Sequence, residues 1–156
     1  MAAIPPALLI VDRQALTVLQ RVMEAARPAE GCALLLGTTG SSWHLQCVWP
    51  CLNCWPEAAE RSRRFALDPR EQLLAQRWAR RQGVQVLGCA HSHPSSEAIP
   101  SATDLALTLA PSLLLIQGRD GLWRAWWHSD DPLGLRELPL SPAADCYRQG
   151  LAPADA

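Results

Sequence analysis

A histidine-containing stretch in the middle of the chain constrains the fold more than any other feature. The short apolar run Val84–Ala90 is typical of a buried strand, and it continues directly into His91 and His93. Asp104 follows eleven residues later, at the fourth position of a helix that Ser101 is expected to open as its N-cap. A loop of this length can fold back, so the fold is expected to join this strand end to this helix start.

The side chains of this stretch suit a metal ion. His91 and His93 are two residues apart, so on an extended segment their imidazoles lie on the same face and can share one ion. Asp104 would complete a set of two histidines and one carboxylate, which leaves the fourth tetrahedral position to water, as catalytic zinc requires. Two histidines beside Pro94 are also compatible with a simple turn, so the pattern predicts a metal site without excluding that alternative.

Glu30 is the candidate proton acceptor for a metal-bound water. It precedes a continuous apolar run that ends at Gly37, and a charged group beside such a run is costly unless it has a role or a partner. Zinc lowers the pKa of its bound water to roughly 7, within reach of a neighbouring carboxylate. The alternative is a plain surface carboxylate near a turn, and the sequence alone does not bring Glu30 next to His91.

Hydrophobic periodicity and turn residues predict an α/β chain of the α+β type, in which a mixed, mainly antiparallel sheet is flanked by helices. Apolar residues at helical spacing predict the first helix, and Pro28 ends it. Asp68 and Pro69 are typical of the start of the second helix, which Gly83 ends. The expected helices span 14–27, 68–82 and 101–110, and the expected strands span 30–37, 43–49, 64–67, 84–90, 113–117 and 122–128.

Length and charge narrow the class of protein. The 156 residues suit one domain over residues 1–140, followed by a flexible C-terminal tail at 141–156 that is rich in Pro and Ala. The formal net charge of −1 argues against a nucleic-acid partner. No apolar stretch reaches the roughly 18 residues of a membrane span, and no charged leader precedes the first apolar run. We therefore expect a cytoplasmic protein with reduced cysteines.

Two further features have competing interpretations. The series His44, Cys47, Cys51 and Cys54 could bind a second metal, but its spacing is not that of paired zinc knuckles, and buried thiols are the simpler interpretation. Trp126 and Trp127 must point to opposite faces of a strand. One ring could therefore be exposed at an interface with a partner or with a second copy in a homodimer.

The residues Glu30, His91-Ser-His-Pro, Ser101 and Asp104 together resemble the JAMM metalloproteases, also called MPN-plus domains, through the spacing H-x-H-x7-S-x2-D. The surrounding sequence resembles the short prokaryotic branch of this family in four places: PAEGCALLLG, the loop asparagine Asn53, RFALDPREQL and VQVLGCAHSHP. The similarity extends from about residue 8 to 128. One departure is Ala33, where the branch often has a glycine.

The resemblance implies an MPN fold, which is cytidine deaminase-like, and an activity. It implies zinc bound by His91, His93 and Asp104, with Glu30 as general acid and base and Ser101 stabilising the oxyanion. The implied reaction is hydrolysis of an amide bond after the C-terminal Gly-Gly of a small ubiquitin-like or sulfur-carrier protein. The alternative within this fold is a non-catalytic binding module or scaffold, although the intact ligand positions argue against it.

Overall fold

The computed structural model describes residues 4–131 and 134–143, and within them one mixed sheet of eight strands forms the centre of the molecule. The strand order is β7-β6-β5-β4-β2-β3-β1-β8, with four antiparallel pairs, and with parallel pairing of β4 with β5 and of β1 with both β3 and β8. The elements are β1 (Leu9–Val11), α1 (Arg13–Ala26), β2 (Cys32–Thr38), β3 (Trp43–Cys51), η1 (Ala58–Glu60), α2 (Pro69–Arg81), β4 (Gln85–Ser92), α3 (Ala102–Leu107), β5 (Ser112–Gln117), β6 (Trp123–His128), β7 (Leu135–Leu138) and β8 (Leu140–Pro142).

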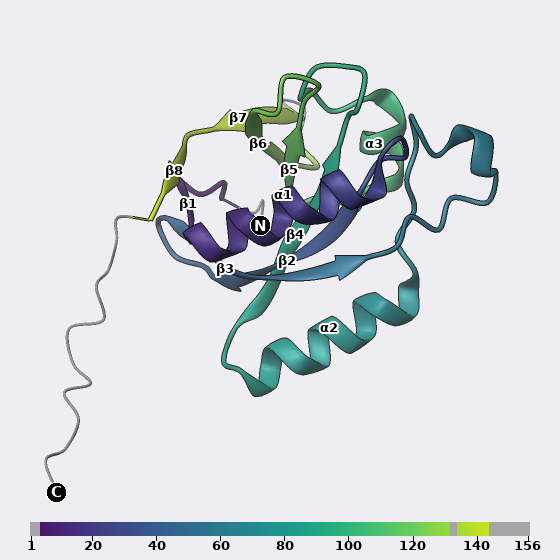
Figure 1. The fold of residues 1–156 in the computed structure, drawn as a ribbon. Coiled ribbons are helices and arrows are strands. Elements are labelled where there is room, and N and C mark those ends of the chain that lie inside the picture. Colours follow the sequence, from purple (N-terminus) through teal and green to yellow (C-terminus); the bar gives the residue numbers. More distant parts are fainter. Residues whose placement is uncertain (1–3, 132–133, 144–156) are drawn as a thin grey trace, which may run out of the picture.

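Helices α1 and α2 cover opposite faces of the sheet (Figure 1). Successive residues of a strand point to opposite faces, so Leu35 of β2 packs in the core under α1 while Leu34 packs in the core under α2. Because both faces are covered, the central strands need apolar residues at nearly every position, which explains the continuous runs in β2 and β5. The predicted mixed α/β fold is confirmed.

The position of β4 determines where functional side chains can gather. It lies between β2, its antiparallel neighbour, and β5, its parallel neighbour. A parallel connection needs a crossover, and here the crossover contains α3. The chain therefore leaves the carboxyl end of β4 in the middle of the sheet and passes through α3 before it returns, which brings residues 91–104 together at this end.

Local sequence signals explain several element boundaries. Asp68 caps α2 by accepting a hydrogen bond from the backbone N–H of Arg70, and Pro69 occupies the first helical turn. Gly83 follows the helix with a φ of 70°, a conformation that favours glycine. Strands β2 and β3 form an antiparallel pair, as do β5 and β6, which agrees with the expected mainly antiparallel sheet.

The predicted strand 64–67 is wrong. This segment has no strand partner, because its polar backbone groups bond to the loop that contains Asn53. The side-chain NH2 of Asn53 donates to the carbonyl of Arg64, while its Oδ1 accepts from the N–H of Ala66. The third predicted helix is also shorter than expected. It ends at Leu107, since Thr108 is already extended at φ −95° and ψ 126°.

Three short strands were not predicted, and one of them moves the expected start of the tail. In β8, Ser141 and Pro142 pair in parallel with Ile10 and Val11 of β1. The predicted boundary at residue 141 therefore falls inside a strand, and residues 144–156 of the predicted tail lie outside the described residues. Three-residue strands show too little alternation to be identified from sequence.

Trp126 and Trp127 point to opposite faces as predicted, but neither is exposed. Trp126 packs in the core under α2 and Trp127 in the core under α1, where it meets the ring of Trp43 edge to face at 5.2 Å. The expected exposed ring is therefore wrong, because each ring packs in one of the two buried apolar clusters of the sheet. A homodimer stays a prediction without support from these two residues. Among the described residues, no helix has both the length and the apolarity that a bilayer crossing requires.

Candidate metal centre

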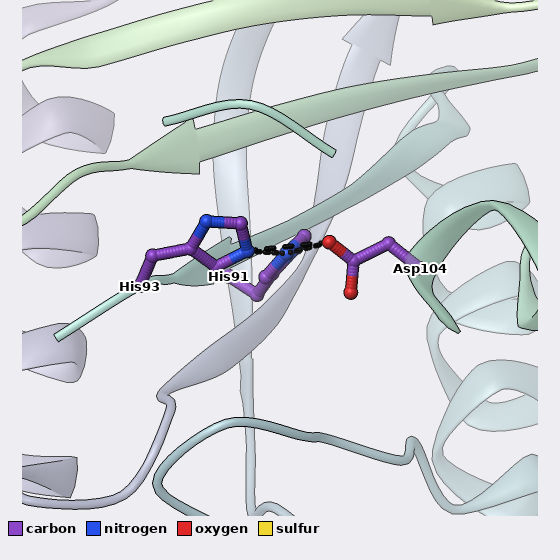
Figure 2. A group of neighbouring side chains, drawn as sticks. All are labelled: His91, His93 and Asp104. Carbon is purple, nitrogen blue, oxygen red and sulfur yellow. Dashed lines mark hydrogen bonds and ion pairs between the residues drawn. The ribbon is translucent and has the colours of Figure 1, made fainter. Parts of the chain in front are cut away.

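The side chains of His91, His93 and Asp104 converge on one point (Figure 2). The Nε2 atoms of His91 and His93 are 3.0 Å apart, and they lie 3.1 Å and 3.2 Å from Oδ2 of Asp104. All three residues are buried, with at most 5% of their surface exposed. The structure therefore brings the three predicted ligands together. One nitrogen or oxygen atom of each side chain lies close enough to the others to bind the same metal ion.

This donor set fits a tetrahedral zinc ion. Nitrogen and oxygen ligands at 2.0–2.2 Å from zinc stand about 3.3 Å from one another in a tetrahedron. The three observed separations of 3.0 to 3.2 Å are close to that edge length. Two imidazoles and one carboxylate are also the ligand types that suit zinc, and three protein ligands leave one coordination position open.

Asp104 is held by the first turn of α3. The backbone N–H of Ser101 donates to Oδ2 of Asp104 at 2.8 Å, and the backbone N–H of Asp104 donates to Oγ of Ser101 at 3.0 Å. This reciprocal pair is a capping box, which fixes both side chains at the helix start. The predicted N-cap role of Ser101 is confirmed, and its O–H remains free to donate a second hydrogen bond.

The charges of the cluster are strongly coupled. Burial opposes ionisation of Asp104, but the hydrogen bonds with His91 and His93 outweigh burial and hold the pKa of Asp104 well below its usual range. Burial lowers the pKa of His91. Burial acts in the same direction on His93, yet its hydrogen bonds to Asp104 and to the carbonyl of Glu97 leave its pKa raised. An ionised aspartate beside a neutral His91 is ready to bind a cation.

Neighbouring groups orient the two imidazoles. Nδ1 of His93 lies 2.6 Å from the carbonyl oxygen of Glu97, so Nδ1–H donates there and Nε2 is the ring nitrogen that faces the cluster and would bind a metal ion. The ring of Phe65 stacks on the ring of His91 at 4.4 Å with an interplanar angle of 24°. The segment expected as a strand at 64–67 therefore covers the metal centre instead.

Glu30 lies beside the cluster, as the sheet register requires. Cys32 of β2 is opposite His91, and Gly31 bonds to Ser92 in both directions, which puts Glu30 next to His93. The Glu30 side chain is 3% exposed, and among the described residues its Oε2 has no hydrogen-bond partner. Burial raises the pKa of Glu30 to about 8, although the charge of His93 opposes this shift.

The backbone of Glu30 is fixed by groups that the sequence did not reveal. Asn53 donates from its side chain to the Glu30 carbonyl at 3.0 Å, and the Glu30 N–H donates to the carbonyl of Arg61 at 2.7 Å. Oγ of Ser92 accepts from the N–H of Gly31 at 2.9 Å. A small polar residue between two buried histidines is costly without a partner, and this signal could have indicated the role of Ser92.

The series of His44, Cys47, Cys51 and Cys54 does not form a second metal site. His44 and Cys51 lie at opposite ends of β3, seven residues apart, which is about 23 Å along a strand. His44 instead pairs with Asp12 at 2.6 Å. Within residues 4–131 and 134–143, the one group with converging metal-binding atoms is that of Figure 2.

A cavity of about 530 Å³ opens beside the metal centre. Asp104 and Phe65 are among its lining residues, together with residues of α2, α3 and the first half of β4. Its walls include apolar side chains such as Leu34, Leu67 and Leu107 together with polar groups from α2 and α3. An extended chain could therefore approach the cluster along this cavity.

Comparisons with known proteins agree with this architecture. In solved structures, the chain resembles a protein from Desulfitobacterium hafniense at a TM-score of 0.78 and 26% identity, covering 90% of this chain and 97% of that one. It resembles a protein from Salinibacter ruber at a TM-score of 0.65 and 28% identity, covering 88% and 92%.

Two named relatives and a family model identify the family of the chain. The chain is 33% identical over 116 residues to the desampylase of Haloferax volcanii, covering 73% of this chain and 78% of that protein. It is 29% identical over 119 residues to the desampylase of Pyrococcus furiosus, covering 76% and 79%. The model of the prokaryotic homologs of the JAB domain matches residues 12–129. The chain therefore belongs to the family of prokaryotic JAB-domain proteins.

Proposed function

We propose that this protein is a zinc-dependent metallo-isopeptidase that hydrolyses an amide bond after the C-terminal Gly-Gly of a small ubiquitin-fold protein. One observation carries the proposal. Three ligand atoms from His91, His93 and Asp104 converge within 3.2 Å of one another, directly beside the buried carboxylate of Glu30, whose Oε2 has no hydrogen-bond partner among the described residues. A cation site next to a proton-transfer group is the minimum that hydrolysis of an amide needs.

Zinc, when bound by His91, His93 and Asp104, supplies Lewis acidity that lowers the pKa of water and polarises a carbonyl. Glu30 handles the proton. Burial raises the pKa of its carboxyl above the usual range, which makes the carboxylate a stronger base that can accept a proton from water and return it to the departing amine. Ser101 accepts from the Asp104 N–H, so its own hydroxyl proton can stabilise negative charge that develops on the substrate carbonyl oxygen.

The substrate follows from the relatives and from the cavity. Two relatives are named desampylases, which favours a conjugate of a ubiquitin-like protein as substrate. A Gly-Gly terminus has no side chains and can enter a narrow approach, and the cavity that Asp104 lines offers such a path. A sulfur-carrier protein with the same terminus fits equally well.

The cysteines also favour a location for this protein. Cys32 and Cys51 are paired neighbours on adjacent strands and their thiols are not linked, which favours a reducing cytoplasm.

The test joins metal content to cleavage. Zinc is measured by elemental analysis in the purified protein, and cleavage is followed on a ubiquitin-fold protein joined through its C-terminal glycine to a lysine side chain of a peptide. We expect about one zinc per chain, cleavage by the wild type, and a loss of at least ~10²-fold in rate for Glu30→Gln with zinc retained.

Two results would contradict the proposal. If the wild type takes up no zinc when zinc is supplied, the three side chains do not form a zinc site and the proposal fails. If it takes up zinc but binds the conjugate without cleaving it, the protein is the non-catalytic MPN-fold binding module that the sequence left as an alternative. Equal rates for the wild type and Glu30→Gln would remove Glu30 from the mechanism.

A further inference from the structure

Three consecutive backbone carbonyls after β4 each have a defined hydrogen-bond donor. The carbonyl of Ser96 accepts from the backbone N–H of Arg119 at 2.8 Å. The carbonyl of Glu97 accepts from Nδ1–H of His93 at 2.6 Å, and that of Ala98 accepts from Nε1–H of Trp126 at 2.8 Å. The carbonyl that orients a metal ligand is therefore fastened on both sides by groups from other elements.

The bond from Trp126 is buried and crosses a long sequence separation. Trp126 is 9% exposed and Ala98 is 5% exposed, so water competes little for either group. Trp126 lies on β6, two strands away from β4, and its ring packs with β5 in the core under α2. The loop after β4 is thus tied to β6, the strand next to the sheet edge, by a side chain that is not one of the three candidate metal ligands.

Neighbouring tryptophans show that this bond is specific to Trp126. Trp123 and Trp127 lie on the same strand, and among the described residues their buried Nε1 atoms have no hydrogen-bond partner. Burial alone therefore does not supply a tryptophan of β6 with an acceptor. The loop also approaches Gly118 closely, where an added Cβ would lie 2.9 Å from the backbone nitrogen of Ala98. The path of the loop is fixed from both sides.

We propose that Trp126 is a positioning residue of the metal centre, acting through Ala98 and Glu97 on His93. The carbonyl of Glu97 must point at Nδ1 of His93 for the lone pair of Nε2 to face the cluster, and rotation of the neighbouring peptide would turn that carbonyl away. Groups that orient a metal-bound histidine raise metal affinity by about 10 to 100-fold. This inference rests on the metal-binding part of the proposed function, and it concerns affinity and not cleavage.

The test measures zinc affinity by competition with a chromogenic chelator. Trp126→Phe keeps an aromatic ring in the core but removes the N–H, and it is expected to weaken zinc binding by about 10 to 100-fold. Trp127→Phe is the matched control, since it removes the same atoms from a residue whose N–H has no partner in the described part of the chain, and it is expected to change zinc affinity less than about threefold. Circular dichroism and thermal unfolding check that both variants fold.

A second substitution protects the test against a packing defect. Benzothienylalanine at position 126 keeps the two-ring shape and replaces the N–H by sulfur, so it is expected to match Trp126→Phe in zinc affinity. Equal affinities for the wild type and both position-126 variants would overturn the proposal, as would equal losses for Trp126→Phe and Trp127→Phe. Substrate cleavage is measured separately. A protein that binds zinc with the expected pattern but cleaves nothing would contradict the proposed function and leave this inference standing.

Discussion

The two halves of the candidate site are built in different ways. The metal-binding half comes from one continuous stretch, from His91 to Asp104, in which a strand end, a loop and a capped helix start follow each other. The half that contains Glu30 is assembled from parts that are distant in sequence. Asn53 and Arg61 form hydrogen bonds with the Glu30 backbone, and Ser92 accepts a hydrogen bond from Gly31. The spacing of residues along the chain determines the first half. The second half forms only after the sheet has folded together with the segment from Asn53 to Ala66, called the 53–66 loop below.

This contrast predicts that metal binding and proton transfer can be lost separately. Asp104→Asn keeps the shape of the side chain but removes its negative charge, which is the main attraction for a cation between two imidazoles. We expect zinc affinity to fall by more than about a hundredfold, and activity to fall with it. Elemental analysis after dialysis measures the zinc content of Asp104→Asn. Glu30→Gln, which is expected to retain zinc, serves as the comparison. Full zinc occupancy in Asp104→Asn would break the division between the two halves.

The second prediction concerns the half that contains Glu30. The side chain of Asn53 donates to the carbonyls of Glu30 and Arg64, and it accepts from the N–H groups of Trp55 and Ala66. Asn53→Ala removes these four bonds and is expected to lower the free energy of unfolding by about 4 kcal/mol, at roughly 1 kcal/mol for each bond. Urea unfolding measures this.

The same variant is expected to reduce turnover at least about tenfold while zinc affinity stays within about threefold of the wild type, because Glu30 loses its backbone support and the ligand segment does not. Steady-state kinetics on variant protein shown to be folded and zinc-loaded provides the comparison. A loss of zinc affinity as large as the loss of turnover would show that the 53–66 loop supports both halves equally.

The third prediction is a pH dependence of the metal-free protein. The pKa of Glu30 is raised from 4.5 to about 8 in the fold, so between these values the native state holds a proton that the unfolded state has released. The contribution of Glu30 to stability is therefore largest below pH 4.5, and it is lost as pH rises towards 8. Between pH 6 and pH 8 the loss is about 2 kcal/mol.

Chemical unfolding in the presence of a chelator, compared between the wild type and Glu30→Gln, isolates this contribution, since the histidines are common to both proteins. The wild type is expected to lose about 2 kcal/mol more than Glu30→Gln over this range. Identical pH profiles would mean that Glu30 does not hold a raised pKa in the folded protein.

The smallest expected effect belongs to Phe65, which covers the ligand half from the 53–66 loop. Its ring stacks on His91 at 4.4 Å, and such a contact contributes about 1 kcal/mol. Phe65→Leu keeps an apolar cover but removes the stacked ring, so zinc affinity is expected to fall about fivefold. Competition with a chelator measures this. No change at all would show that the loop supports only Glu30.

The sequence was most informative where function depends on local geometry. His91, His93, Asp104 and the Ser101 cap could be predicted because an i, i+2 strand spacing and a helix N-cap are set by neighbouring residues. The roles of Asn53 and Trp126 could not, since each bonds to a carbonyl distant in sequence, and any carbonyl is chemically the same as the next.

The error at Arg64–Leu67 has the same origin. Its apolar pattern is typical of a strand, but its backbone partners are in the loop around Asn53, so it packs over His91 instead of joining the sheet. Short strands at the sheet edge, such as Leu9–Val11, depend in the same way on partners that are distant along the chain.

The most direct test of the central claim is an anomalous difference map at the zinc absorption edge, from crystals of the protein supplied with zinc. We expect one peak about 2.0 to 2.2 Å from Nε2 of His91, Nε2 of His93 and Oδ2 of Asp104, with Glu30 beside its open side. A peak at the cysteines of β2 and β3, or no peak within coordinating distance of these three atoms, would contradict it.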